Sequence, residues 1–164
     1  MEQKTKIHAE DGKHDLVITR EFELPLALLF KAYTEAEIVE QWMGTKVLKL
    51  ENKQHGGYRF ETPDAKGNIV VRMHGSIHEF SEEKRITRTF EMENTSFPVQ
   101  LEFLDFEATS ADTSKLTMHI IYRSVADRDA MLKLPFAQGI NMAHKRLEDV
   151  VHMRMNKKQN TEHS

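Results

Sequence analysis

The alternation of hydrophobic and polar positions predicts seven strands, two short helices and one long helix. Residues 15–24 alternate apolar with polar side chains, the pattern of a strand with one buried face. Residues 25–43 then carry apolar side chains at helical spacing, in two short helices that end at Met43-Gly44. Period-two alternation returns in residues 46–51, 58–62, 69–80, 85–93, 97–107 and 115–123. Short polar turns separate these segments, so we expect hairpins and an antiparallel sheet with a polar outer face.

The final long segment, residues 134–155, predicts an amphipathic helix. Its apolar stripe, at spacings of three and four, comprises Phe136, Ile140, Ala143, Leu147, Val150 and Val151. The opposite, polar side comprises Gln138, Asn141, Lys145, Glu148, Asp149 and His152. Residues 125–134 are expected to form a loop or a broken helical lead-in. A single amphipathic helix after a run of strands needs a sheet to bury its stripe, so the predicted class is α+β.

Composition narrows the function classes. The chain has 164 residues, 23 basic and 26 acidic side chains and a net charge of −3, with no long block of either sign. This balance predicts neither nucleic-acid binding nor attraction to an anionic membrane. Cysteine is absent, which excludes disulfides and thiolate chemistry.

The ends and the localisation are predicted from polarity. The first residues are too polar for a signal peptide, and no apolar run approaches the roughly 18 residues of a membrane span. We therefore expect a cytoplasmic protein with a flexible tail at 1–13, a single folded domain at 14–156 and a flexible tail at 157–164.

Several short motifs, taken in order, resemble a known superfamily. They are Thr19 to Phe22 with Pro25, Phe30 to Glu37, Gln41-Trp42, Gly56-Gly57, Asp64 to Gly67, Gly75, Arg85-Ile86, and Gln138-Gly139 with Lys145 to Leu147. Over residues 16–151 the chain resembles the SRPBCC (START-like) superfamily, the helix-grip fold of the birch pollen allergen, and most of all the activators of the heat-shock chaperone ATPase. The resemblance implies a curved sheet of about six to seven strands wrapped around the long helix, with an apolar cavity between them. Met43, Thr45 and Phe90 depart from the residues usual in that family, at positions that shape loops and cavity.

Metal binding and nucleophilic hydrolysis are disfavoured. His74 and His78 on one strand would lie about 13 Å apart, too far to share a zinc ion. His144, Glu148 and His152 share a helix face, but the predicted polar one. No nucleophile turn or phosphate-binding glycine loop appears. We expect no metal and no cofactor.

Polar residues on apolar faces are the informative ones. Arg20 lies on the apolar side of its strand and needs a partner or an edge position. Arg88 alternates with Ile86 and Phe90, so it pairs with an acid such as Asp105, lies near a sheet edge, or meets the carboxylate or phosphate of a ligand.

The expected cavity lies between the inner sheet face and the Phe136–Ile140 end of the helix. Its predicted lining is Trp42, Phe60, Met73, Arg88, Phe90, Leu101, Phe103, Met118, Tyr122, Phe136 and Ile140. The methionines among them suit an adaptable pocket and equally suit plain core packing.

Three functional hypotheses follow. The first is binding of a small apolar or amphipathic molecule, by a monomer or homodimer with no nucleic-acid or membrane partner. The second, implied by the resemblance, is a chaperone-binding module. The third, also implied by the resemblance, is an aromatase/cyclase-like enzyme that would use Tyr122 and Arg88, although the sequence contains no evident acid–base pair.

Overall fold

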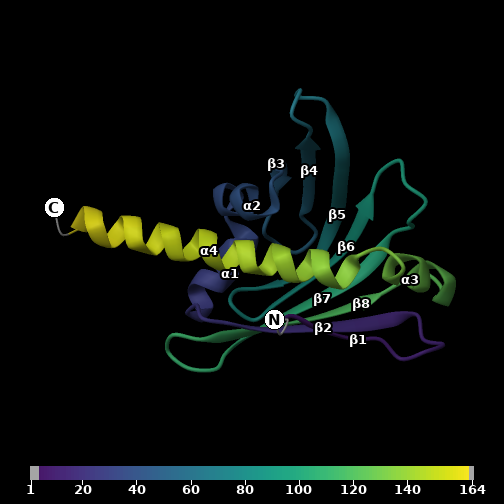
Figure 1. Ribbon diagram of the computed structural model, residues 1–164, viewed down its shortest axis with the longest axis horizontal. Coiled ribbons are helices and arrows are strands. Elements are labelled where there is room, and N and C mark those ends of the chain that lie inside the picture. Colours follow the sequence, from purple (N-terminus) through teal and green to yellow (C-terminus); the bar gives the residue numbers. More distant parts are fainter. Residues whose placement is uncertain (1–3, 163–164) are drawn as a thin grey trace.

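The computed structural model describes residues 4–162 and contains one antiparallel sheet and four helices (Figure 1). The sheet has eight strands in the order β1-β2-β8-β7-β6-β5-β4-β3. The strands are β1 (Lys6–His8), β2 (Asp15–Phe22), β3 (Lys46–Leu50), β4 (Gly57–Pro63), β5 (Ile69–Ser81), β6 (Arg85–Met92), β7 (Gln100–Ala108) and β8 (Ser114–Ile121). The helices are α1 (Leu26–Thr34), α2 (Ala36–Met43), α3 (Val125–Leu132) and α4 (Phe136–Glu162). The predicted α+β helix-grip architecture is confirmed.

The sheet bends around the long helix. Strands β3 to β8 follow one another as hairpins, and the last of them, β8, pairs with β2. Helices α1 and α2 therefore carry the chain from β2 to β3, which lies at the opposite edge of the sheet. In Figure 1, β3, β4 and β5 stand almost upright, whereas β1, β2 and β8 run nearly parallel to α4. The concave face produced by this bend is the one that α4 crosses.

The two short helices form as the apolar spacing predicts. Helix α1 buries Leu29, Phe30 and Tyr33, and α2 buries Ile38, Val39 and Trp42. Helix α2 ends at Gly44, whose φ of 64° is left-handed and whose N–H donates to the Glu40 carbonyl at 3.0 Å. Glycine adopts this C-terminal conformation without the steric cost that a Cβ would bring.

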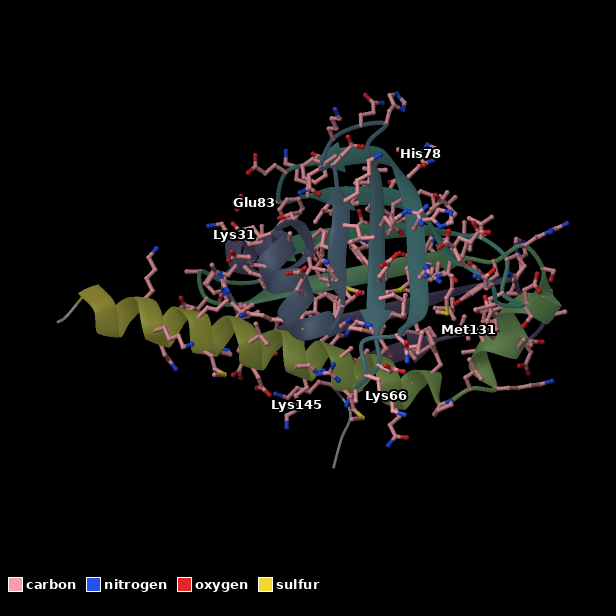
Figure 2. The ribbon with its side chains drawn as sticks, turned by 90° about the horizontal axis from the view of Figure 1, so that it is seen from above. Lys31, Lys66, His78, Glu83, Met131 and Lys145 are labelled. Carbon is pink, nitrogen blue, oxygen red and sulfur yellow. The ribbon has the colours of Figure 1, made fainter. Side chains whose placement is uncertain are left out.

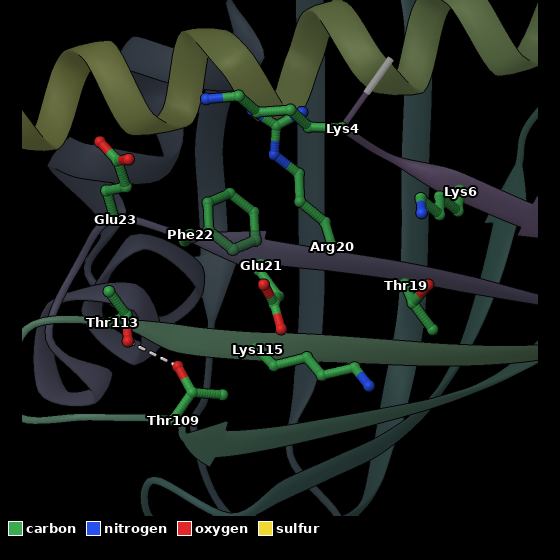
Figure 3. A pocket seen from close by; sticks show the side chains of 10 residues that line it. All are labelled: Lys4, Lys6, Thr19, Arg20, Glu21, Phe22, Glu23, Thr109, Thr113 and Lys115. Carbon is green, nitrogen blue, oxygen red and sulfur yellow. Dashed lines mark hydrogen bonds between the residues drawn. The ribbon is translucent and has the colours of Figure 1, made fainter. Parts of the chain in front are cut away.

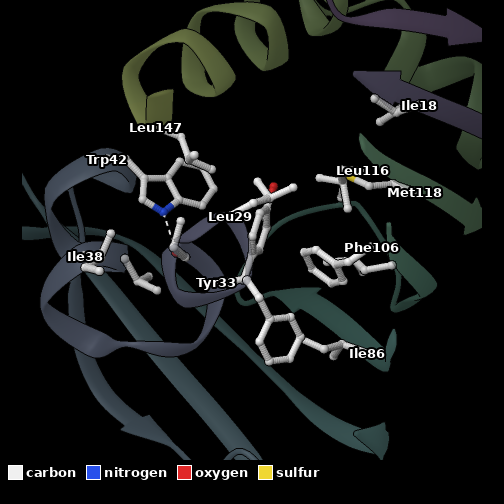
Figure 4. Close-up of a cluster of buried hydrophobic side chains, with 14 of the residues drawn as sticks. Ile18, Leu29, Tyr33, Ile38, Trp42, Ile86, Phe106, Leu116, Met118 and Leu147 are labelled. Atoms are coloured by element: carbon white, nitrogen blue, oxygen red, sulfur yellow. Dashed lines mark hydrogen bonds between the residues drawn. The ribbon is translucent and has the colours of Figure 1, made fainter. Parts of the chain in front are cut away.

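The core joins α1, α2 and α4 to the concave face of the sheet (Figure 4). Phe30 meets Phe106 of β7 edge to face at 5.0 Å, and Tyr33 meets Trp42 in the same way at 5.2 Å. The Trp42 indole N–H donates to the Ala32 carbonyl at 2.7 Å, so its polar atom is satisfied inside the core. These contacts fix α2 against α1 and leave one face of Trp42 toward α4.

Helix α4 is amphipathic, but its buried stripe is rotated from the predicted one. Leu147 and Val151 are fully buried as expected, whereas Ile140, Ala143 and Val150 are only half-buried. The assignment of His144 and Glu148 to a solvent-facing side is wrong: both are buried, because Arg20 of β2 and the N-terminal segment offer them polar partners. Lys145, next to His144 in sequence, points away from the sheet (Figure 2).

Three segments differ from expectation in extent. Within residues 1–13, Lys6–His8 form β1 and pair with β2. Residues 125–132 form a regular helix, α3, because Ser124 accepts a hydrogen bond from the Asp127 N–H at 3.1 Å and caps it. Helix α4 continues to Glu162, beyond the predicted end at Met155. Among residues 4–162, no helix combines the length and apolarity that crossing a membrane requires.

Candidate functional site

A pocket of about 240 Å³ lies between α2, α4 and the concave face of the sheet. We call it the α2–α4 pocket. It is lined by Tyr33, Val39, Trp42, Met43, Phe60, Arg88, Phe90, Glu102, Met118, Ile140, Ala143, His144 and Arg146. Most of these side chains are apolar, and the polar ones come from two neighbouring strands and from α4. Apolar walls with a few polar groups are typical of small-molecule sites.

The polar floor of the pocket is an ion pair between adjacent strands. Arg88 of β6 and Glu102 of β7 are register partners on the concave face. The Arg88 Nε–H donates to Glu102 Oε1 at 3.0 Å, and the Gln100 amide donates to Oε2 at 2.8 Å. The two charged side chains are only 14% and 6% exposed. Arg88 is thus paired inside the protein, with Glu102 and not with Asp105, which binds the exposed Arg85 at 2.6 Å.

Most N–H groups of the Arg88 guanidinium have no acceptor among residues 4–162. A guanidinium carries five N–H groups, and only the one on Nε has a partner in the part of the chain that the structure describes. The side chain is not sealed off, because part of it reaches the pocket surface. Its Nη groups are therefore the donors that a bound molecule would meet.

Tyr58 and Gly75 hold Arg88 in place. The Arg88 guanidinium carbon lies 5.1 Å from the centre of the Tyr58 ring, a cation–π contact. The Tyr58 hydroxyl donates to the Thr89 carbonyl at 2.6 Å. A Cβ on Gly75 would lie 2.7 Å from the Tyr58 ring and 2.0 Å from the Thr89 carbonyl oxygen. Glycine at 75 thus lets Tyr58 reach beneath the guanidinium.

Trp42 and Tyr33 form the wall on the side of α1 and α2 (Figure 4). Burial raises the pKa of the Tyr33 hydroxyl, so it stays protonated and able to donate a hydrogen bond. At the mouth, the exposed Arg146 of α4 donates to the Trp42 carbonyl at 3.2 Å, which ties α4 to α2.

The structure brings together six of the eleven predicted lining residues: Trp42, Phe60, Arg88, Phe90, Met118 and Ile140. Three others, Met73, Tyr122 and Phe136, lie on the concave side or on α4 but outside the pocket. The pocket therefore opens about one helical turn further along α4 than the predicted Phe136 end. The Tyr122 hydroxyl is buried without a partner among the described residues and does not reach the pocket.

Leu101 and Phe103 are on the wrong face of β7 for the predicted cavity. The concave face of β7 carries Gln100, Glu102, Leu104 and Phe106, so Leu101 and Phe103 point to the other side. Phe103 packs there beside His119 of β8, with ring centres 5.9 Å apart. The apolar side chains of β7 switch from one face to the other between Phe103 and Leu104, so the sequence pattern does not show which face is buried. In the structure, the face that carries Leu104 and Phe106 is the buried one.

Sequence reasoning missed Glu102, Tyr33, His144 and Arg146 as lining residues. The signal for Glu102 was Arg88 itself, because a buried cation requires a partner and Glu102 is the acidic residue opposite Arg88 on β7. The departures from the usual family residues also matter, since Met43 and Phe90 both line the pocket.

A buried polar cluster, the Arg20 network, adjoins the pocket through His144. It consists of Thr5, Arg20, Asn141, His144 and Glu148. Arg20 Nη1 donates to Thr5 Oγ1 at 3.0 Å and to Asn141 Oδ1 at 3.1 Å, and Nη2 lies 3.7 Å from Glu148. His144 Nδ1 lies 2.9 Å from Thr5 Oγ1. Burial, with the nearby Arg20 charge, lowers the pKa of His144 to about 3, so its ring is neutral near pH 7.

A wider hollow of about 800 Å³ lies beside β2 (Figure 3). Its lining mixes Lys4, Lys6 and Lys115 with Glu21 and Glu23, and Glu21 and Lys115 are register partners on β2 and β8. The Thr109 and Thr113 hydroxyls, 2.6 Å apart, satisfy each other. Arg20 also lines this hollow, but its Nη atoms already face protein oxygens. In residues 4–162, no three His, Asp or Glu side chains gather in a way that could hold a metal ion.

The fold and the pocket define a protein of the helix-grip class, and comparison with solved structures agrees. Protein Ms6760 of Mycobacterium smegmatis matches with a TM-score of 0.77 and 17% identity, over 89% of this chain and 95% of that one. A protein of Rhodobacter sphaeroides matches with a TM-score of 0.79 and 18% identity, over 90% and 99%. Protein NE0264 of Nitrosomonas europaea matches with a TM-score of 0.74 and 20% identity, over 90% and 99%. At these identities the likeness concerns the fold alone.

The family follows from the sequence match. Residues 23–152 match the sequence model of the family described as activator of Hsp90 ATPase homolog 1-like protein. This range covers most of the chain and includes every residue that lines the α2–α4 pocket, whereas Thr5 and Arg20 of the Arg20 network lie before it. The chain belongs to this family, as the resemblance predicted. No curated protein matches the chain.

Proposed function

We propose that the protein binds one small, mostly apolar molecule in the α2–α4 pocket. The observation that supports this most directly is Arg88, a largely buried guanidinium on the surface of a mostly apolar pocket, whose Nη groups have no acceptor among residues 4–162. A ligand acceptor placed there would form charge-assisted hydrogen bonds with these groups.

The size of the pocket limits the ligand. A volume of about 240 Å³ equals the space of roughly eight waters, so a ligand of on the order of ten non-hydrogen atoms fits. This is close to the lower end of typical small-molecule sites. We therefore expect a single substituted ring or a short branched chain.

Trp42 provides the test, because it is the only tryptophan of the chain and lines the pocket. A panel of small aromatic and aliphatic compounds should change its emission saturably, with millimolar or better dissociation constants. Native mass spectrometry of protein purified from its own host should show a co-purifying small molecule.

A matched pair of variants checks the location. Ala143→Leu would fill the pocket from α4 and should weaken binding at least tenfold. Ala137→Leu adds the same group at an exposed position of the same helix and should leave binding unchanged. Equal binding by both variants, or no saturable ligand in the panel, would contradict the proposal.

A second candidate, a chaperone-binding module, is supported by the family match alone. Stimulation of the ATPase of a purified Hsp90 by the full chain would support it. No stimulation and no binding at tens of micromolar would argue against it.

A further inference from the structure

We propose that the α2–α4 pocket selects uncharged ligands with a hydrogen-bond acceptor, such as an amide, ester or ketone, and rejects carboxylates. This inference rests on the proposed function. It comes from the way Arg88 and Glu102 share the pocket floor, and it names Glu102 as the residue that determines specificity.

The need for an acceptor comes from Arg88. Its Nε–H is occupied by Glu102, its guanidinium carbon lies over the Tyr58 ring, and its Nη groups have no acceptor among residues 4–162. A carbonyl oxygen at the pocket floor would accept from these groups. A pure hydrocarbon would fill the same volume and leave them unpartnered.

The rejection of negative charge comes from Glu102. Arg88 and Glu102 are in direct contact and both are largely buried, so their charges cancel at the pocket floor. Glu102 remains bound by two donors, from Arg88 and Gln100. A ligand carboxylate that reached the same guanidinium would come within a few ångströms of Glu102, in surroundings that screen repulsion poorly.

No other buried cation in the lining compensates. His144 is neutral near pH 7, since burial lowers its pKa to about 3. Arg20, beyond His144, already faces Glu148 and two side-chain oxygens. Arg146 is exposed at the mouth, where water screens its charge and an ion pair gains little. The pocket can therefore hold a polar head group but not a full negative charge.

Two probes of equal size test the inference: para-ethylbenzamide, which is neutral, and para-ethylbenzoate, which is an anion at neutral pH. Para-ethyltoluene supplies the hydrocarbon reference. Titration of the full chain, followed by Trp42 emission and calorimetry, should give at least tenfold tighter binding of the amide than of either reference. Glu102→Gln keeps the side-chain shape and an oxygen for the Arg88 Nε–H, but leaves Arg88 as a net positive charge. In this variant the preference for the amide over the carboxylate should disappear or reverse.

Each outcome decides a separate point. Carboxylate binding as tight as amide binding in the parent protein would overturn the inference and leave the proposed function standing. Hydrocarbon binding as tight as amide binding would overturn the role of Arg88. An unchanged ratio in folded Glu102→Gln protein would overturn the role of Glu102. If thermal unfolding shows that Glu102→Gln does not fold, the ratio in the parent protein decides alone. Failure of all three probes to bind would contradict the proposed function itself.

Discussion

Arg20 and Arg88 lie on the concave face of the sheet and have similar surroundings. They differ in whether their terminal Nη groups face oxygens of the protein. Each has an aromatic ring under its guanidinium, Phe22 at 5.2 Å for Arg20 and Tyr58 at 5.1 Å for Arg88. Each also faces a glutamate. The difference lies in the terminal nitrogens: both Nη atoms of Arg20 face protein oxygens, whereas those of Arg88 face the pocket.

This difference separates a structural role from a binding role. Arg20 connects three segments, because its partners come from the N-terminal segment and from two turns of α4. Arg88 pairs across β6 and β7, which are already joined by backbone hydrogen bonds, and otherwise contacts the Tyr58 ring of β4 in the same sheet. Removal of Arg20 should therefore cost mainly stability, and removal of Arg88 together with its partner should cost mainly ligand binding.

The largest effect is expected for Arg20→Leu. The change leaves Glu148 buried without its cation and deprives Thr5 and Asn141 of a donor, so we expect a loss of about 3 kcal/mol or more in the free energy of unfolding. Urea unfolding followed by circular dichroism measures it. Arg123→Leu, at an exposed position, is the control and should change stability by less than about 0.5 kcal/mol. A loss in Arg20→Leu no larger than in Arg123→Leu would show that Arg20 has no structural role.

The Arg88 pair should behave differently when both partners change. Arg88→Met alone leaves Glu102 buried and should cost about 3 kcal/mol, because one charge loses its partner. Adding Glu102→Met should restore stability to within about 1 kcal/mol of the parent, since an apolar pair often replaces a buried ion pair at little cost. The double variant should lose the preference for the amide probe over the hydrocarbon. A double variant less stable than the single one would show that the ion pair is structural.

His144 lines the α2–α4 pocket and also belongs to the Arg20 network. Its titration should make the stability of the protein depend on pH. Its pKa is about 3 when folded, against an ordinary value near 6.5 when unfolded. The unfolded chain therefore binds the extra proton first, so the contribution of neutral His144 is complete above about pH 6.5 and is lost as pH falls toward about 3.

The expected slope is up to about 1.4 kcal/mol per pH unit inside that window. Urea unfolding at several pH values measures it, and His144→Gln, which does not titrate, is the reference. If both proteins lose stability equally between pH 6.5 and pH 4, the titrating group is not His144.

The sequence predicted the architecture better than the site. Long alternating strands such as β5 and β8 and the periodic helix α4 carry their pattern over many residues, so their type and order were confirmed. The inward face of strand β7 was predicted wrongly because its apolar residues switch faces at Phe103-Leu104, and the pairing of Glu102 with Arg88 was not predicted. The positions of His144 and Glu148 were predicted wrongly because a polar side chain can be buried when a distant segment supplies a partner. Helical periodicity cannot reveal that segment.

The smallest effect is expected on the outer face of β7. Leu101 lies one residue before Glu102 and points to the opposite side of the sheet, away from both arginines. Leu101→Thr keeps a strand-forming side chain and should lower the free energy of unfolding by less than about 1 kcal/mol, with amide binding unchanged. The same change at Leu104, which is fully buried on the concave face, should cost at least about 2 kcal/mol. Because side chains alternate along a strand, a Leu101→Thr variant that weakens amide binding tenfold would mean that Leu101 and not Glu102 faces the pocket, and the assignment of Glu102 as partner of Arg88 would fall with it.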